Sequence, residues 1–245
     1  MPTTAEGFTL RLARLKADLV DQSRRVQAMV EAAFDAAFAL NNAEGARIIQ
    51  MDEAIDRVDV EIERACVLLL TDACAEGAQL PSDELRMVLT IVKINNELER
   101  IADVGVSIAE EVQPLVHAQA SLPETFRVMS NSVIGILRDS RTALDKNDGK
   151  LAKVVLASED AIEAFKKSIL RDAQMKVSTG RMTVDQAFML HELATYCEVM
   201  SGHCTNIAEQ VLYIATGEVV RHTHGHWEKF DLGSTSEPTG ASPRV

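Results

Sequence analysis

Pairs of acidic residues four positions apart recur at matching places in the two halves of this chain. The matched positions are Asp52/Asp56, Glu99/Asp103, Glu159/Glu163 and Glu198/Gly202, and of these only Gly202 is not acidic. On a helix, residues i and i+4 project from one face about a turn apart, so two carboxylates there repel each other unless a cation lies between them. The spacing therefore predicts helices that carry a cation-binding face in each half.

The sequence around these pairs is repeated as well. Residues 48–56 match residues 155–163, and residues 99–112 match residues 198–211. Similarity at a fixed internal spacing is typical of a repeated structural unit. The two halves of the chain therefore look like one unit that has been duplicated.

Composition favours a folded, helical chain. Hydrophobic residues make up 47% of the 245 residues and aromatic residues only 4%, with few Gly and Pro, which argues against both disorder and a sheet protein. The formal charge of −12 argues against a nucleic-acid partner, because phosphate binding needs clustered Lys and Arg. Such a charge suits cations or a basic protein surface.

Breakers and helix caps divide the chain into long helical stretches. The predicted helices span roughly residues 8–40, 43–77, 82–113, 122–146, 148–179 and 183–217. Capping-box sequences begin at Asn41, Ser121 and Thr183, each followed three residues later by Glu or Gln. Three antiparallel helices per half predict an all-α fold of two tandem three-helix bundles, residues 8–116 and 121–218.

The apolar pattern of these helices shows where the acidic pairs point. On the second helix a seam of apolar residues spaced three and four apart runs through Ile48, Ile55 and Ile62, and on the third it runs through Leu98, Ile101 and Ile108. In both helices acidic residues such as Asp56 and Glu99 lie one position beyond a seam residue. If the two acidic stripes of a half face each other, three or four carboxylates converge on one patch.

Converging carboxylate oxygens suit divalent or ferric ions, whereas zinc more often takes Cys and His ligands. Two other interpretations stay open. Acidic residues beside an apolar seam also form ordinary solvated faces, so the chain may be read as a metal-free helical scaffold, or as one that docks on a basic helical partner. A carboxylate-bridged di-iron enzyme is the second. Such an enzyme normally uses Glu-x-x-His on two helices, and no such sequence occurs in this chain, which argues strongly against it.

The sequence also predicts a location. The first 22 residues are interrupted by charged residues and do not resemble a signal peptide, and no apolar run approaches the roughly 18 residues of a membrane span. We therefore expect a cytoplasmic protein. The chain's cysteines lack a Cys-x-x-Cys spacing and fall in helical patterns, which predicts buried, reduced thiols at Cys66, Cys74, Cys197 and Cys204.

Several of these residues resemble a known family. The segment Glu97-Leu98-Glu99-Arg100-Ile101-Ala102-Asp103 is similar to the Glu-Arg-Ile-Gly-Asp signature of PhoU proteins, the cytosolic regulators of phosphate-specific transport. Asp52-x-x-Ile-Asp56 resembles the acidic motif on the helix before it. His203 to Glu209, followed by Tyr213 and Thr216-Gly217-Glu218, resembles the family's closing segment. The resemblance covers about residues 8–220.

The resemblance implies both an architecture and a role. It implies tandem three-helix bundles, commonly in a homodimer, whose acidic motifs carry metal ions: iron above all, with zinc, manganese or magnesium as alternatives. It further implies a negative regulator without catalytic activity that couples the ATPase subunit of a phosphate ABC transporter to a sensor histidine kinase. Such a protein reaches the membrane only through these partners.

The resemblance also assigns ligands by position. The first metal patch would contain Asp52, Asp56, Glu99 and Asp103. The second would contain Glu159, Glu163, Glu198 and Asn206. The second patch departs from the family pattern, since Val199-Met200-Ser201-Gly202 follows the glutamate and removes both the basic residue and the second carboxylate. We expect a weaker, smaller or empty second site, and the loss leaves open that this chain is a paralogue of the main regulator.

The end of the chain changes character. From residue 219 onward, alternating histidines are followed by a stretch rich in Gly, Ser, Thr and Pro. This composition predicts a disordered tail over residues 219–245, to which we assign no function.

Overall fold

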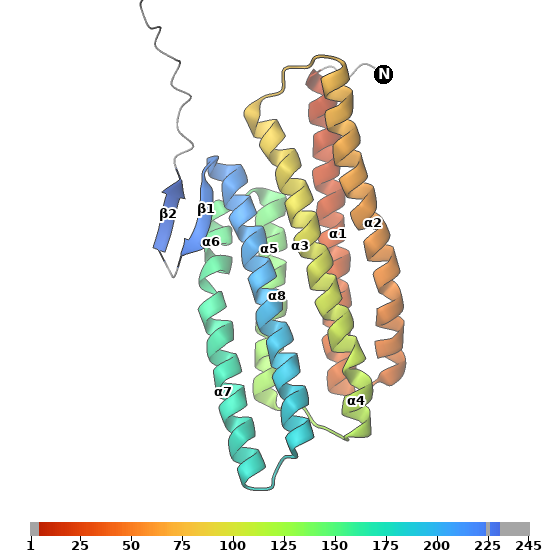
Figure 1. Cartoon of the computed structure of the whole chain (residues 1–245), viewed down its shortest axis with the longest axis vertical. Coiled ribbons are helices and arrows are strands. Elements are labelled where there is room, and N and C mark those ends of the chain that lie inside the picture. The colour runs from red at the N-terminus through yellow and green to blue at the C-terminus, as the bar shows by residue number, and fades with distance from the viewer. Residues whose placement is uncertain (1–4, 224–225, 231–245) are drawn as a thin grey trace, which may run out of the picture.

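The computed structural model of the chain describes residues 5–223 and 226–230 (Figure 1). Its helices are α1 (Ala5–Ala39), α2 (Asn42–Ala75), α3 (Ser82–Glu110), α4 (Val112–His117), α5 (Glu124–Lys146), α6 (Gly149–Ala157), α7 (Glu159–Ser178) and α8 (Val184–Thr216). Two short strands, β1 (Val219–Thr223) and β2 (His226–Phe230), follow α8. None of the described helices is long and apolar enough to cross a membrane.

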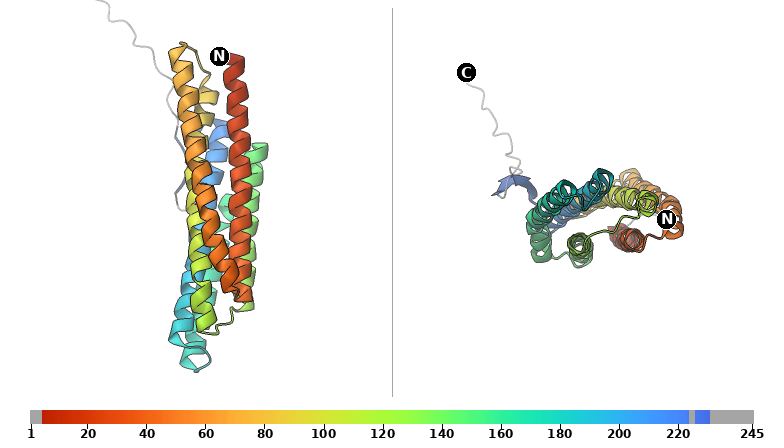
Figure 2. Two further views of the ribbon diagram at one scale, coloured as in Figure 1. Left: turned by 90° about the vertical axis from the view of Figure 1, so that its right-hand side faces the viewer. Right: turned by 90° about the horizontal axis from the view of Figure 1, so that it is seen from below.

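The helices form two bundles of three, which confirms the predicted all-α tandem architecture. The first bundle contains α1, α2 and α3, and the second contains α5, α8 and the stacked pair α6 and α7 (Figure 1). The bundles join where α1 packs on α5 and α3 packs on α8. Seen along its length, the molecule has one curved layer of α2, α3, α8 and α7, backed by a layer of α1 and α5 (Figure 2). We call the outer surface of the first layer the four-helix face.

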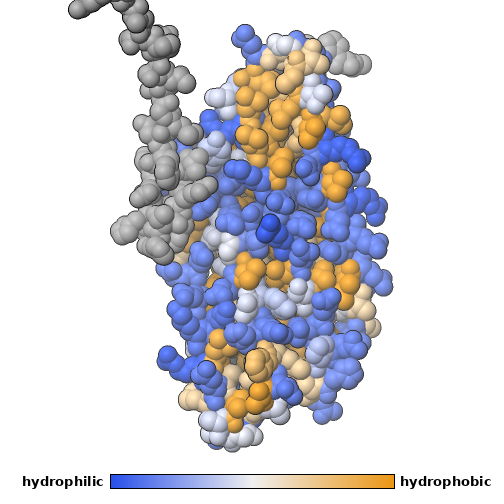
Figure 3. Space-filling model, viewed as in Figure 1, coloured by the Kyte–Doolittle hydropathy of each residue, from blue (hydrophilic) through white to orange (hydrophobic). Residues whose placement is uncertain are grey.

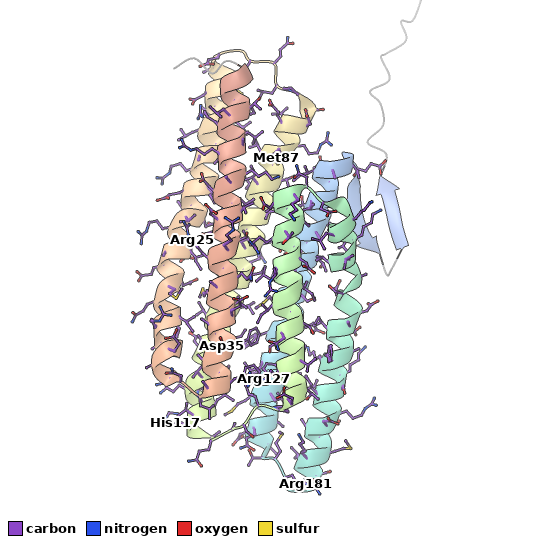
Figure 4. All side chains as sticks on the ribbon, turned by 180° about the vertical axis from the view of Figure 1, so that it is seen from behind. Arg25, Asp35, Met87, His117, Arg127 and Arg181 are labelled. Carbon is purple, nitrogen blue, oxygen red and sulfur yellow. The ribbon has the colours of Figure 1, made fainter. Side chains whose placement is uncertain are left out.

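One hydrophobic core runs through both bundles. Phe34 of α1 and Phe126 of α5 lie at the join, with ring centroids 6.2 Å apart. Phe126 also packs against Phe38, with centroids 5.7 Å apart. Arg127, labelled on α5 in the view from behind, lies over the Phe38 ring, with its guanidinium carbon 3.8 Å from the ring centroid (Figure 4). Aromatic and cation–π contacts therefore fasten α5 to α1.

Two predicted helices are each broken in the structure. The helix expected over residues 82–113 breaks at Glu111, because Pro114 has no N–H to donate to the carbonyl of Glu110 and its ring crowds that carbonyl. The helix expected over 148–179 breaks at Ser158, whose hydroxyl donates to the carbonyl oxygen of Val155 at 2.5 Å. A serine side chain that bonds the preceding turn competes with the helical backbone ladder.

Two of the three predicted capping boxes act as caps. Asn41 accepts a hydrogen bond from the backbone N–H of Glu44 at 3.2 Å, and Thr183 and Gln186 form the complete reciprocal box. The box predicted at Ser121 is wrong. Helix α5 begins after Pro123, which occupies the cap position and makes no side-chain hydrogen bond there. The capping-box motif predicted the start of α5 two residues too early, because the prediction took no account of Pro123.

The chain passes from one bundle to the other through α4 and residues 118–123 (Figure 2). Helix α4 packs on all three helices of the first bundle. We therefore keep the division into residues 8–116 and 121–218 as a proposal, with α4 assigned to the first unit.

The predicted disordered tail differs from the structure over part of its length. Strands β1 and β2 pair antiparallel, with Val219 opposite Phe230 and Thr223 opposite His226. The sequences VVRHT and HWEKF are rich in β-branched and aromatic residues, which favour strands, and the tail's overall composition masked this local signal. Residues 224–225 and 231–245 of the predicted tail lie outside the described residues.

The prediction of buried thiols holds for Cys66, Cys197 and Cys204 and is wrong for Cys74, which is exposed in the last turn of α2. Burial raises the pKa of the Cys66 thiol to about 11 and that of Cys204 to about 12. These two sulfurs therefore stay protonated near neutral pH and behave as apolar packing groups.

Candidate functional site

The acidic residues of the first bundle lie where the apolar seam predicts. The seam residues Ile48, Ile55 and Ile62 of α2 are at most 3% exposed, as are Leu98 and Ile101 of α3. The acids one or two positions beyond the seam residues therefore emerge at the edge of the core, where α2 and α3 pack together. We call these acids the N-terminal acidic cluster: Asp52, Asp56, Asp59, Glu99 and Asp103.

The carboxylates of this cluster act on one another across the two helices. Partial burial raises the pKa of Asp52, and the negative charges of Asp56 and Asp103 raise it further. Partial burial likewise raises the pKa of Glu99, followed by the charges of Asp103, Asp59 and Asp56, against a smaller opposing effect of Arg100. The four residues predicted for the first patch therefore lie on the facing edges of α2 and α3 and influence one another electrostatically, as does Asp59.

The negative charge of the N-terminal acidic cluster is not neutralised by ion pairs. In the described part of the chain, none of its carboxylates lies within ion-pair distance of a Lys, Arg or His side chain. Asp59 accepts a hydrogen bond from the side-chain amide of Asn95 at 2.6 Å. The Oδ1 atom of Asp52 is buried and has no hydrogen-bond partner. A buried acceptor without a partner is costly, and a bound cation would satisfy it.

Two of the three corresponding acids of the second bundle are paired with lysines. We call the three acids the C-terminal acidic cluster: Glu159, Glu163 and Glu198. Glu198 of α8 accepts a hydrogen bond from Lys166 of α7 at 2.6 Å, and Glu163 pairs with Lys167 at the same distance. At Gly202, where the repeat has its missing carboxylate, open space lies around the position of an added Cβ. The positive charges of Lys166 and Lys167 thus balance two carboxylates that a metal ion would otherwise neutralise.

Asn206 does not join the C-terminal acidic cluster. Its side-chain amide donates to the carboxylate of Glu97 on α3 at 3.0 Å, and His203 contacts the same oxygen through Nδ1 at 2.7 Å. Burial acts to raise the pKa of Glu97, but the hydrogen bonds from His203 and Asn206 outweigh it and leave this pKa below its usual value. In this structure Asn206 therefore faces Glu97 and not the other predicted residues of the second patch, because the approach of α3 offers it a charged acceptor.

The Glu97 contact was missed by sequence reasoning. Glu97 lies within the acidic motif of α3, but only the packing of α3 against α8 shows that it faces the second bundle. Its contact with both His203 and Asn206 links α3 of the first bundle to α8 of the second. The signal in the sequence was the spacing of His203 and Asn206, which places both on one side of α8.

The donor set of the N-terminal acidic cluster fits a hard cation. Carboxylate oxygens are the ligands that magnesium, manganese and ferric iron prefer, and the mutual repulsion of these groups would fall on cation binding. Within the described residues, no three Asp, Glu, His or Cys side chains are close enough together to hold one ion. Coordination would therefore require these side chains to turn toward a common point.

Comparison with known proteins gives a consistent result. The PhoU domain family model matches residues 19–112 and residues 126–211, one segment in each bundle. The phosphate-specific transport system accessory protein PhoU homolog of Aquifex aeolicus (strain VF5) is 28% identical over 214 residues, which cover 87% of this chain and 95% of that protein. The PhoU homolog 1 of Thermotoga maritima is 25% identical over 213 residues, covering 86% and 90%.

Solved structures share the fold. The crystal structure of the regulatory protein PhoU from Streptococcus pneumoniae aligns with a TM-score of 0.79 at 21% identity, covering 88% of this chain and 100% of that one. PhoU from Pseudomonas aeruginosa aligns with a TM-score of 0.78 at 21% identity, covering 86% and 99%. At this level of identity the likeness establishes the architecture of the chain.

Proposed function

This chain belongs to the PhoU family, and we propose that it is an accessory regulator of phosphate uptake. The observation that carries the proposal is the family match over both bundles, together with relatives named as accessory proteins of the phosphate-specific transport system. We propose a negative role, in which the protein keeps phosphate-starvation genes off when phosphate is ample. The chain acts by binding and not as an enzyme.

We propose that the protein binds the ATPase subunit of a phosphate ABC transporter and a sensor histidine kinase. It works in the cytoplasm as a homodimer and meets the membrane only through these partners. The long helical layers support this role, because they present broad, rigid faces on which a partner can dock (Figure 2). The Glu97 contact supports transmission between the bundles, since it holds α3 and α8 in one arrangement.

We further propose that the N-terminal acidic cluster binds a metal ion, with iron as the first choice and zinc, manganese or magnesium as alternatives. Asp52, Asp56, Glu99 and Asp103 would hold it. The unpartnered oxygen of Asp52 and the mutually raised pKa values of Asp52 and Glu99 support this assignment. A bound cation would supply charge neutralisation and fix the distance between α2 and α3.

A metal-free helical adaptor, or a paralogue of the main regulator, is the second candidate. The lysine pairs at Glu163 and Glu198 favour it, because they show how this fold neutralises the same face without metal. Such an adaptor would use the N-terminal acidic cluster to dock on a basic partner.

Deletion of the gene in its own organism tests the proposed function. With ample phosphate, a reporter for phosphate-starvation genes should switch on in the deletion strain and switch off again when the full chain is restored. Restoring the Asp56→Ala/Asp103→Ala variant tests whether the N-terminal acidic cluster is needed to silence the reporter, and the metal content of the purified wild-type protein separates the two candidates, because only the metal-dependent regulator carries a bound ion. An unchanged reporter in the deletion strain would contradict a role as the main regulator and favour the paralogue.

A further inference from the structure

The four-helix face carries an apolar region next to the N-terminal acidic cluster. Val67 of α2 and Leu85 and Leu89 of α3 are 57%, 39% and 56% exposed, at the end of the bundle where α2 turns into α3. Hydrophobic side chains gather over this end of the face, and hydrophilic side chains cover its middle (Figure 3). We call Val67, Leu85 and Leu89 the apolar end. Contiguous exposed apolar groups of this kind mark interaction surfaces.

The apolar end and the acidic cluster lie along one stripe of each helix. On α2 the spacing of three and four residues that contains Asp52, Asp56 and Asp59 continues through Glu63 to Val67. On α3 the same spacing leads back from Glu99 toward Leu89 and Leu85. At 1.5 Å per residue, the stripe from Leu85 to Asp103 is about 27 Å long. This length matches a partner helix of about 18 residues.

The negative charge of the stripe indicates which kind of partner it can bind. In the described structure, Asp52, Asp56, Glu63 and Glu99 have no ion-pair partner, so this part of the face is negative. A second copy of the chain, with its formal charge of −12, would add negative charge against negative charge. A helix with Lys or Arg residues at one end and apolar residues at the other would satisfy both parts of the stripe.

We propose that the stripe from the apolar end to the N-terminal acidic cluster is the docking surface for one amphipathic helix of a partner protein. The apolar half of that helix packs on Leu85, Leu89 and Val67. Its basic half lies over Asp59 and Glu63, which are not among the proposed metal ligands. The inference rests on the proposed function in one respect, namely that this protein acts by contact with a partner.

The opposite end of the four-helix face supplies a matched control. Val184 and Phe188 of α8 are the counterparts of Leu85 and Leu89 in the repeat and are 56% and 64% exposed. They line an apolar groove with Leu170 and Val177 of α7, and its volume is about 520 Å³. The acids beyond this groove are paired with Lys166 and Lys167. The second end therefore offers apolar contact without the free negative charge.

A binding experiment with a defined peptide tests the proposal. The probe is a labelled helical peptide of about 18 residues, with Leu and Ala in one half and Lys and Ala in the other. An isomer of the same composition, with Leu and Lys mixed along its length, is the control peptide. Binding to the full chain is measured by fluorescence anisotropy at low and high salt, and the oligomeric state by light scattering.

The stripe should prefer the segregated peptide over its mixed isomer. Leu89→Gln should weaken that binding about tenfold, because a buried leucine contact is lost. Glu63→Gln should weaken it about threefold and reduce its salt dependence. Phe188→Gln should leave the affinity within about twofold, since the matched apolar end lacks free acids. Each substituted residue is exposed, and an unchanged melting temperature confirms that the variants fold.

Three outcomes would overturn the proposal. Equal affinity for the two peptides would show charge attraction alone, and equal losses in Leu89→Gln and Phe188→Gln would show that the stripe is not the site. A dimer that becomes a monomer on Leu89→Gln would assign the apolar end to a second copy. None of these outcomes affects the reporter result of the deletion strain, so the docking surface and the proposed function are tested independently of each other.

Discussion

The two acidic clusters occupy matching positions of a duplicated fold but differ in how their charge is balanced. In the first bundle, Asp52 and Glu99 have pKa values raised by burial and by neighbouring carboxylates. In the second, Glu163 and Glu198 each lie 2.6 Å from a lysine nitrogen. The first copy of the motif therefore retains repulsion between its carboxylates, whereas lysines balance two of the three acids in the second. Repulsion that is kept leaves the first cluster ready to bind a cation or a cationic partner.

Metal content should give the largest difference between the clusters. We expect untagged protein purified without chelator to carry a metal ion that is lost in Asp56→Ala/Asp103→Ala and kept in Glu163→Ala/Glu198→Ala. Only the first pair removes carboxylates that have no lysine partner. Elemental analysis of the three proteins measures this. Equal metal loss in both double variants would remove the distinction between the clusters.

Substitution of Glu97 tests how much the contact between α3 and α8 contributes to the stability of the fold. Glu97→Gln should lower the free energy of unfolding by about 2 kcal/mol, because a partly buried charged hydrogen-bonding group is lost to His203 and Asn206. Urea unfolding gives this value. Glu124→Gln, in an exposed pair 3.6 Å from Arg127, is the control and should change the free energy by less than about 0.5 kcal/mol. Equal effects would show that Glu97 contributes no more than a surface ion pair.

Neutralising one acid in each cluster should change stability in opposite directions. In chelator-treated protein, Asp52→Asn should raise the free energy of unfolding by roughly 0.5 kcal/mol, since it removes repulsion from Asp56 and Asp103. Glu198→Gln should lower it by a similar amount, roughly 0.5 kcal/mol, because the bond to Lys166 is weakened. If the two substitutions changed the free energy of unfolding in the same direction in parallel urea titrations, the proposed difference between the clusters would be wrong.

The pH dependence of stability sharpens the comparison further and is the smallest effect. A carboxyl group whose pKa is raised by folding stabilises the fold below its unfolded pKa, and this contribution is lost as pH rises through the folded pKa. The gain from Asp52→Asn should therefore be present at pH 7 and vanish below about pH 4. Glu97 has a lowered pKa, so its contribution is present at pH 7 and lost as pH falls through that value. Unfolding curves at several pH values follow both trends.

The sequence predicted the parts of this molecule that depend on spacing within one helix. The apolar seam through Ile48 and Ile55 and the one-residue offset of Asp52 and Asp56 follow from helical geometry, and the structure has both. The Glu163 and Lys167 pair was also readable, since it is an i,i+4 pair. Helix breaks at Glu111 and Ser158 were missed, because a nearby proline and a serine hydroxyl outweighed the apolar pattern.

Contacts between helices far apart in the sequence were beyond such reasoning. Lys166 reaches Glu198 across 32 positions, and Glu97 meets His203 across 106. Both depend on which side of α8 faces α7 and which faces α3, and that is decided by packing of the whole core. Asn206 illustrates the difficulty, because its place four residues beyond Gly202 suggested a ligand of the second patch, whereas the fold offered it a carboxylate on another helix.

The core that runs through both bundles makes the two halves one cooperative system. Leu98 and Ile101 of α3 and Ile207 and Val211 of α8 are buried in a folded chain in which α3 and α8 pack together. A fragment that ended after α4 would expose the α8-facing side of α3 to water and would aggregate or remain loosely packed. Because the two units share this core, we expect them to unfold together, with one melting temperature that a core substitution in either half lowers.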